Sequence, residues 1–413
     1  MTTAQSLFEI PATRRPLGRV PRLGVFDDNR QKPIHRWYPF VEGYSAELVG
    51  RALEDLPATG VLLDPFGGSG TTALTAALAG RDSLFCEINP YLAWVADVKV
   101  NRSRRANSSG GAEDLRALAD TLKTWCPDAG GPHPLIDADT RRGFFPDGVA
   151  GTVVASLRLA EEVCGPDAVE IAKLAIATAL IPASNMIRRT DLRKRRPGDP
   201  PPQPFTPRVI ENLLAMADDL SVVGADLNGR TTRVAEDARQ LPSLDAPVDL
   251  VVTSPPYLNG TNYCRNTKLE LLALGLVAGE SELANLRLGS IAAGINNISR
   301  RRSSPDVIPS VEAIATALDE VAYDPRIPSM VRMYFSDMLR VFASVRSSSR
   351  PGTRWLLDIG DSRFSGVHVP THELLCDVAS MAGWTHVSTE TIRTRRSYDG
   401  SHLTQVLLEF RAI

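Results

Sequence analysis

The chain has 413 residues, of which 43% are hydrophobic and 23% are charged, and its formal net charge is −2. This composition is ordinary for a globular protein of one large domain or two, and the net charge alone does not indicate a nucleic-acid-binding protein. No apolar run approaches the roughly 20 residues that a membrane-spanning helix requires, and the N-terminal sequence lacks the apolar core of a signal peptide. The five cysteines show no CxxC spacing, so we expect reduced thiols in a cytoplasmic protein without a metal site.

Basic residues are unevenly distributed despite the balanced total. Three arginine-rich clusters occur, RRTDLRKRRP (188–197), SRRRSS (299–304) and RTRR (393–396). Each cluster taken singly is typical of exposed surface or of a flexible loop. Together, in a chain of balanced charge, they favour a localised anionic partner.

The N-terminal residues 1–33 are rich in proline, arginine and glycine and show no periodicity, which predicts an extended arm. Beyond Gly60, short apolar runs alternate with helical patterns. The expected strands are 61–64, 83–88, 232–237, 249–254 and 354–359, and the expected helices are 71–80, 90–100, 328–346 and 370–382.

The alternation is interrupted by an insertion over residues 101–230. Helical segments are expected there near 152–163, 167–181 and 207–220, whereas the proline-rich stretch 195–207 predicts neither a helix nor a central strand. The chain ends in two β-rich runs, WTHVSTETIRT and LTQVLLEFRA, which we expect to form an antiparallel pair. The whole pattern predicts an α/β fold with a doubly wound, Rossmann-like sheet that is mostly parallel, and with its ligand at the carboxyl ends of the strands.

A glycine-rich loop, DPFGGSGTT (64–72), follows the first expected strand and opens a helix. Its glycines allow a sharp turn and a close approach to a ligand. Twenty residues after Gly67, Glu87 ends the second strand, where an acid suits the two hydroxyls of a ribose. The order of these features predicts a nucleoside-containing cofactor; the alternative is a purely structural turn with Glu87 on the surface.

The loop also limits which cofactor fits. No lysine follows the last glycine, as a Walker A loop would require, and the GGSG pattern differs from the GxGxxG of dinucleotide sites. Asp64 and Thr71 place polar groups around the turn, and these suit a zwitterionic amino-acid tail better than a pyrophosphate.

The second motif, TSPPY, ends the strand 249–254. Two prolines stop the strand because each has a fixed φ and neither carries an N–H. They leave Ser254 and Tyr257 on a rigid turn whose Pro255 carbonyl is a free acceptor. The alternative is a proline turn that only caps a strand, with Tyr257 packed in the core.

Together, DPFGGSGTT and TSPPY resemble the amino-group DNA methyltransferases, which use S-adenosylmethionine to methylate N4 of cytosine or N6 of adenine. The resemblance extends to HRWYPFVEGYSAELV (35–49), to the continuation of the second motif as far as residue 275, and to residues 334–370. It implies a methyltransferase catalytic domain over residues 34–100 and 231–413. In many relatives the TSPPY motif precedes the glycine loop, whereas here it follows the loop by roughly 180 residues, as circular permutation of one fold allows.

The resemblance also implies roles for single residues. Glu87 would bind the ribose hydroxyls, Asp237 the adenine amine, and Tyr38 with Pro39 would cover the cofactor. The methionine and ribose would lie among Asp64, Phe66, Gly67, Gly68, Gly70 and Thr71.

The chemistry explains why the second motif has these residues. An exocyclic amine is a poor nucleophile because its lone pair is delocalised into the ring. Acceptors such as the Ser254 hydroxyl and the Pro255 carbonyl would hold its hydrogens, and Pro256 keeps the turn rigid. Tyr257 offers a flat face to a base swung out of the duplex. Neither a metal nor a covalent nucleophile is needed.

Within the family, Ser at the position of Ser254 is commoner among cytosine-N4 enzymes, so we expect cytosine N4 to be the methylated atom. The expected function is a site-specific DNA methyltransferase of a restriction–modification or related defence system. The expected partners are double-stranded DNA and a cognate endonuclease. Three alternatives stay open: an adenine-N6 enzyme, an RNA guanine-N2 methyltransferase, and a protein of the same fold that binds nucleic acid or a partner without catalysis.

Two regions are candidates for target recognition, the insertion 101–230 and the stretch 258–327, and they could share the role. The expected phosphate contacts are Arg188, Arg189, Arg193, Lys194, Arg195, Arg196 and Arg301.

Overall fold

The computed structural model describes residues 23–40, 43–127, 131–188, 191–258, 263–298, 305–396, 400 and 402–413. Most of the predicted arm, residues 1–22, lies outside the described residues, as do Arg189 and Arg301.

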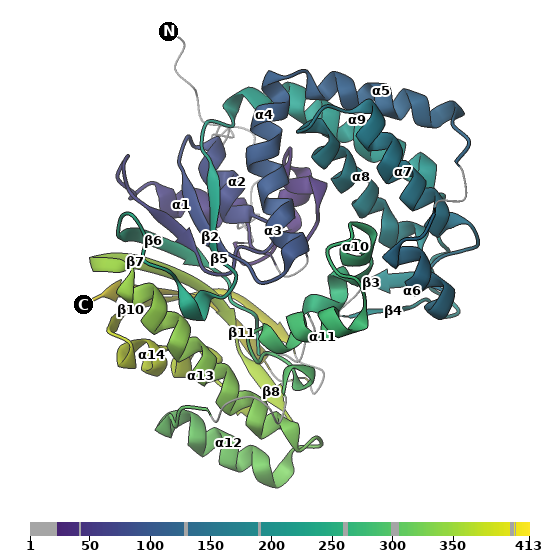
Figure 1. Ribbon diagram of the computed structural model, residues 1–413. Coiled ribbons are helices and arrows are strands. Elements are labelled where there is room, and N and C mark those ends of the chain that lie inside the picture. The colour runs from purple at the N-terminus through teal and green to yellow at the C-terminus, as the bar shows by residue number, and fades with distance from the viewer. Residues whose placement is uncertain are drawn as a thin grey trace.

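A seven-stranded sheet forms the centre of the protein, in the order β10-β11-β7-β6-β1-β2-β5 (Figure 1). Neighbouring strands are parallel except for β11, which runs antiparallel to both β7 and β10. This confirms the predicted α/β class, with a doubly wound, mostly parallel sheet that ends in an antiparallel pair. The bounds are β1 Leu62–Asp64, β2 Ser83–Cys86, β5 Thr231–Ala235, β6 Val248–Thr253, β7 Ser349–Gly360, β10 Trp384–Arg396 and β11 His402–Ala412.

Helices cover both faces of the sheet. Successive strand residues point to opposite faces, so Leu62 packs with helices α1 and α2, and its neighbour Leu63 belongs to the core formed with α13 and α14. An aromatic cluster of Phe342, Trp355 and Trp384 fills the second face. The bounds are α1 Ala46–Leu53, α2 Thr71–Leu78, α12 Pro309–Val321, α13 Arg326–Ser347 and α14 Thr371–Met381.

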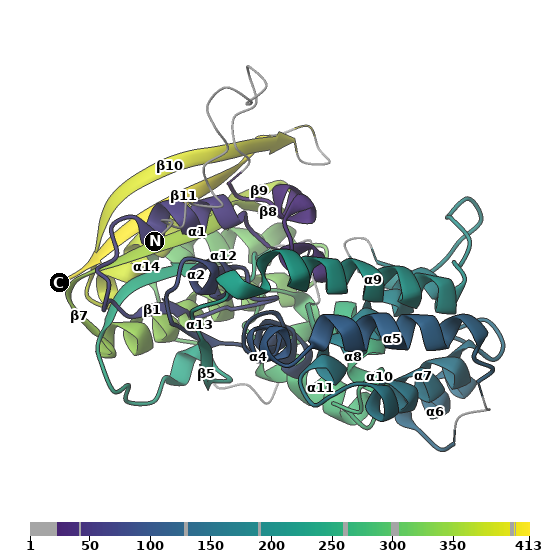
Figure 2. The ribbon, with the colours of Figure 1, turned by 90° about the horizontal axis from the view of Figure 1, so that it is seen from above.

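The insertion forms a mainly helical lobe to one side of the sheet (Figures 1 and 2). It leaves the sheet through α3, Pro90–Asp97, and one turn of π-helix, Val98–Arg102. Its central helix, α8, buries apolar residues on most of its surface and packs between α5, α7 and α9. The bounds are α4 Ser103–Ser108, α5 Gly111–Thr124, α6 Pro134–Arg142, α7 Val149–Val163, α8 Ala168–Ala183, β3 Met186–Arg188, β4 Leu192–Lys194 and α9 Phe205–Val223.

Smaller elements complete the described chain. The helices α10 Lys268–Ala273 and α11 Glu280–Gly289 follow the TSPPY strand, and a β8–β9 hairpin, Ser362–Phe364 with Val367–Val369, follows β7. None of the helices in the described ranges is long and apolar enough to cross a bilayer.

One expectation about the N-terminal arm is wrong for its last part. Residues Asp27–Gln31 form a 3₁₀ helix, and Phe26 beside it is buried. The buried Asn29 side chain donates to the Tyr44 carbonyl at 2.9 Å and accepts from the Ala46 amide at 2.9 Å. This segment is packed because its few apolar and amide side chains find partners at the start of α1.

Candidate active site

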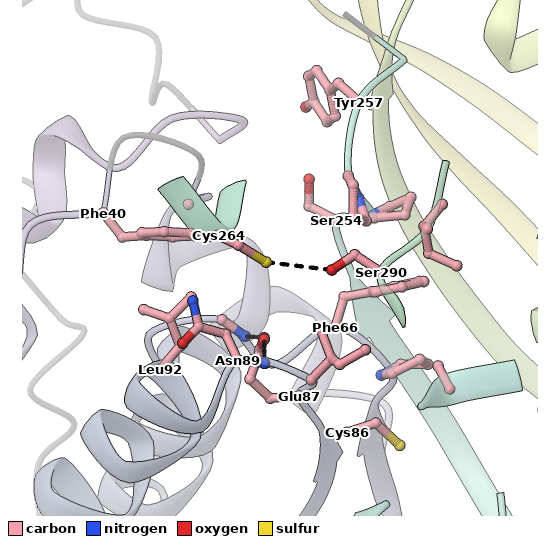
Figure 3. Close-up of a pocket in the computed structure, with 18 of the residues that line it drawn as sticks. Phe40, Phe66, Cys86, Glu87, Asn89, Leu92, Ser254, Tyr257, Cys264 and Ser290 are labelled. Carbon is pink, nitrogen blue, oxygen red and sulfur yellow. Dashed lines mark hydrogen bonds between the residues drawn. The ribbon is translucent and has the colours of Figure 1, made fainter. Parts of the chain in front are cut away.

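A pocket of about 350 Å³ opens where the chain order of the sheet reverses, between β1 and β6 (Figure 3). Ligands of doubly wound sheets bind at this switch point, outside the carboxyl ends of the strands. The loops that follow β1, β2, β5 and β6 all contribute to its lining. The predicted site residues that line it are Phe66, Gly68, Glu87, Asp237, Ser254, Pro255, Pro256 and Tyr257.

The glycine loop is folded tightly under the pocket. The Gly67 amide donates to the Cys86 carbonyl at 2.9 Å, and a Cβ at Gly67 would lie 2.7 Å from the Phe85 ring. Gly70 has a φ of +82°, and a Cβ there would lie 3.0 Å from the Ala96 backbone. Neither position tolerates a side chain without a shift. Both glycines therefore shape the loop without lining the pocket themselves.

Glu87 is held by the backbone on both sides. One carboxylate oxygen accepts from the Gly68 amide at 2.9 Å, and the other accepts from the Asn89 amide at 2.8 Å. Burial raises the pKa of the carboxyl to about 7, although these two bonds favour the charged form. The side chain is thus oriented before any ligand binds, and each oxygen keeps a free lone pair for a hydroxyl donor.

Besides Gly67 and Gly70, three predicted cofactor residues do not line the pocket. Asp64, 2% exposed, accepts from the Phe66 amide at 3.0 Å and from Thr253 Oγ1 at 2.6 Å, so its carboxylate joins β1 to β6. Thr71 is buried in the first turn of α2. Tyr38 is buried, with its ring edge-on to Tyr91 at 5.3 Å.

Phe40, which the sequence analysis did not single out, lines the pocket two residues after Tyr38. Its ring would lie 3.3 Å from a Cβ at Gly68, so it covers the glycine loop directly. In Figure 3 its ring extends into the pocket from the wall opposite Ser254. In this segment Tyr38 therefore packs in the core, whereas Phe40, two residues later, lines the pocket.

Asp237 lines the pocket with its charge already paired. Its carboxylate accepts from Arg239 Nε at 2.9 Å and from Arg239 Nη2 at 2.8 Å. The same guanidinium reaches Asp337 at 2.7 Å and the Gly289 carbonyl at 2.5 Å. Asp237 is therefore positioned rigidly, and an incoming donor would share this carboxylate with Arg239.

The Ser254–Tyr257 corner is backed by a buried acid that sequence reasoning missed. Asp358 in β7 is 1% exposed and hydrogen-bonds the side chains of Ser254 and Tyr257. Gln405 Nε2 lies 2.8 Å from Asp358 Oδ1 and 2.9 Å from the Tyr257 hydroxyl. Burial raises the pKa of Asp358 to about 7, against the lowering effect of its bonds with Gln405, Tyr257 and Ser254. The signal in the sequence is an acid within the apolar strand RWLLDI.

A further part of the pocket wall comes from the segment after the corner and from β10. It includes Cys264 and Ser290, whose Sγ and Oγ lie 3.4 Å apart, and also Asn297 and Arg393. No residue of the described part of the insertion 101–230 lines the pocket.

Much of the cluster 188–196 is engaged within the protein. Arg188 pairs with the buried Glu270 and donates through Nε to the Asn266 carbonyl at 2.9 Å. Arg193 pairs with Asp199 at 2.7 Å. Arg195 donates to four backbone carbonyls, those of residues 181, 182, 184 and 200. Lys194 and Arg196 are exposed, whereas the predicted contacts Arg189 and Arg301 lie outside the described residues.

Arg188→Ala is expected to lower the free energy of unfolding by about 3–5 kcal/mol, because Glu270, 1% exposed, would keep a buried charge without its partner. Chemical denaturation measures this loss. The matched double variant, Arg188→Met with Glu270→Leu, removes both charges and should recover most of the stability. Wild-type stability in Arg188→Ala, together with weaker binding of nucleic acid, would instead favour a phosphate contact at this position.

Comparisons with known proteins found similarity to Type II methyltransferases. The chain is 22% identical over 433 residues to the Type II methyltransferase M.BsoBI of Geobacillus stearothermophilus, covering 91% of this chain and 83% of that protein. It is 22% identical over 406 residues to the Type II methyltransferase M.AvaI of Nostoc sp., covering 88% and 81%. No protein-family model matches the chain. A superposition on the rRNA methyltransferase aviRa of Streptomyces viridochromogenes covers 97% of this chain and 96% of that one, at 12% identity and a TM-score of 0.32.

Proposed function

We propose that this chain is a DNA methyltransferase that transfers a methyl group from S-adenosylmethionine to the exocyclic amine of a base, cytosine N4 in the first place. The observation that carries this proposal is one pocket shared by Glu87 with its glycine loop and by the Ser254–Tyr257 corner. The similarity to two Type II methyltransferases supports it.

The described residues of the pocket fit the methyl donor. Glu87 presents fixed carboxylate oxygens to two ribose hydroxyls, and Asp237 presents an acceptor to an amine. Phe66 and Phe40 supply apolar surface beside Gly68. When bound, S-adenosylmethionine supplies an electrophilic methyl group on its sulfonium sulfur.

The corner acts on the amine of the base. The Ser254 hydroxyl and the Pro255 carbonyl accept the two amine hydrogens, which draws electron density to the nitrogen and directs its lone pair towards the methyl group. The nitrogen gains a bond to the methyl carbon as the bond from that carbon to the sulfonium sulfur breaks, which leaves a neutral thioether, and the nitrogen must lose one proton. Asp358, which is hydrogen-bonded to Ser254, is the base that accepts this proton, and the serine hydroxyl passes the proton from the nitrogen to Asp358.

Tyr257 holds the base in place. An enzyme that modifies a base amine must take the base out of the helical stack, and an aromatic face replaces part of the lost stacking. The Tyr257 hydroxyl is fixed by Gln405 at 2.9 Å, so the orientation of the ring is set before substrate binds.

Within this proposal the substrate is double-stranded DNA, and the protein belongs to a restriction–modification or related defence system with a cognate endonuclease as partner. Ser254 favours cytosine over adenine. Because residues 264–297 contribute to the pocket wall and the described part of the insertion does not, we place base recognition in the stretch 258–327 and assign the insertion a supporting role.

The rate of methyl transfer should rise with pH and reach half of its maximum near pH 7. Below that pH the Asp358 carboxyl, whose pKa is about 7, holds its proton and cannot accept another. Single-turnover rates at saturating cofactor measure this step. Because Glu87 acts in cofactor binding, its titration does not affect a rate measured at saturation. Asp358→Asn should be slower by about 10²-fold or more and should lose the rise near pH 7. An unchanged profile in Asp358→Asn would exclude this carboxyl as the base.

Expression in a methylation-free host, followed by single-molecule sequencing of its genome, tests the function as a whole. N4-methylcytosine at one recurring sequence is the expected result. N6-methyladenine would show that the methylated base is adenine and not cytosine. A genome without modification, together with methylated cellular RNA, would show that the substrate is RNA and not DNA.

A further inference from the structure

Strand β10 is the edge strand of the sheet, and Arg393 lies near its end. The strand pairs with β11 along its whole length, and the two form a long hairpin beside the described N-terminal segment (Figure 2). Arg393 is exposed, yet it also lines the pocket together with Tyr257, Gln405 and Gly24. It therefore lies at the mouth of the pocket, on the side of the Tyr257 ring.

A β-bulge brings Arg393 to this position. The pairing register passes from Thr391 opposite Val406 to Arg393 opposite Gln405, leaving Ile392 without a partner residue. Ile392 packs against the core that includes Leu407. A bulge of this kind redirects the following side chain, and such bulges are frequent next to active sites.

The residue opposite Arg393 connects it to the corner. Side chains of directly opposed residues in an antiparallel pair have Cβ atoms about 4.5–5.5 Å apart. Gln405 in turn lies 2.9 Å from the Tyr257 hydroxyl and 2.8 Å from Asp358. Gln405 therefore links Arg393, its directly opposed residue, to the Tyr257 ring that would hold the base.

The charge of Arg393 is not neutralised within the described part of the protein. Arg354 on β7 and Arg411 on β11 both pair with Glu409, at 2.9 Å and 3.3 Å. Arg188 and Arg193 pair with acids, and Arg195 donates to backbone carbonyls. For Arg393, by contrast, no ion pair or hydrogen bond is found among the described residues.

We infer that Arg393 binds the DNA backbone phosphate next to the extruded nucleotide and so holds the strand at the mouth of the pocket. A nucleotide that rotates out of the helix turns about its own backbone, which keeps its flanking phosphates at the rim. A planar guanidinium binds a phosphate through two parallel hydrogen bonds. This inference rests on the proposed function, because it requires a nucleic-acid strand at this site.

Arg393→Ala tests the contact in titrations of duplex DNA that carries the recognised sequence, over a series of salt concentrations. Loss of a charge-assisted contact should weaken binding by about tenfold or more, and the slope of log affinity against log salt should fall by about one. Arg393→Lys keeps the charge and should keep the slope, although the loss of two-point binding weakens affinity. Binding of S-adenosylmethionine should stay unchanged in both variants.

Arg230→Ala is the matched control, because Arg230 is also exposed but directly precedes β5, at the amino end of the strands and away from the pocket. It should behave as the wild type. If the wild type methylates DNA and Arg393→Ala shows the wild-type affinity and salt slope, the phosphate contact is refuted and the proposed function stands. If the wild type neither binds nor methylates duplex DNA, both proposals fail.

Discussion

Ser254→Ala is expected to lower the rate of methyl transfer by about 10²–10³-fold, the loss that follows removal of one fixed hydrogen-bonding group from a reacting centre. The hydroxyl is both an acceptor for an amine hydrogen and the link to Asp358. Binding of S-adenosylmethionine should be preserved, because the proposed cofactor residues, Glu87 and the glycine loop, lie on the other side of the pocket. Single-turnover methylation and calorimetric titration of the cofactor measure the two effects separately.

Two variants of Tyr257 refine this test. Tyr257→Ala removes the face on which the base stacks and should cost about 1–3 kcal/mol in binding of the extruded base. Tyr257→Phe keeps the ring and loses only the hydroxyl bound by Gln405 and Asp358, so it should be much less impaired. Full activity in both Ser254→Ala and Tyr257→Ala would exclude the corner as the place where the amine is held.

Glu87→Ala is expected to weaken S-adenosylmethionine binding by about 10²–10⁴-fold, since it removes two hydrogen bonds to a charged group, each worth about 1.5–3 kcal/mol. The variant also leaves the Gly68 and Asn89 amides without their acceptors, which loosens the loop. Calorimetry on the free protein gives the affinity directly. The rate at saturating cofactor should change far less than the affinity.

The matched replacement Glu87→Gln keeps one acceptor oxygen but turns an amide N–H₂ towards a second backbone donor. Its affinity should therefore lie between those of the wild type and Glu87→Ala. Glu54→Ala, which changes an exposed acid after α1, serves as the surface control. Wild-type affinity in Glu87→Ala would mean that the cofactor does not bind at the end of β2.

The sequence predicted the sheet and one side of the pocket because the relevant constraints are local. Glycines that need a tight turn and prolines that end a strand can be recognised without a partner. Because the carboxyl ends of parallel strands meet at one edge, Gly68, Glu87, Asp237 and Ser254 were expected to lie close together, and they line one pocket.

The missed features depend on contacts between distant segments. Asp358 meets Ser254 only because β7 lies beside β6, and Gln405 joins them through the register of β11. Phe40 takes the place in the pocket predicted for Tyr38 because Tyr38 packs against Tyr91. A count of charges could not show that Glu270 neutralises Arg188.

In the proposed site the methyl donor lies beside Glu87 and faces the base amine, which is held at Ser254. The most direct test is to offer S-adenosylmethionine with an isotope-labelled methyl group, together with unmethylated duplex DNA, and to identify the product nucleoside by mass spectrometry. Labelled N4-methyldeoxycytidine is the predicted product, formed by the wild type and absent with Ser254→Ala. A label on a ring carbon, or no labelled nucleoside from protein that binds the cofactor, would contradict the proposed chemistry.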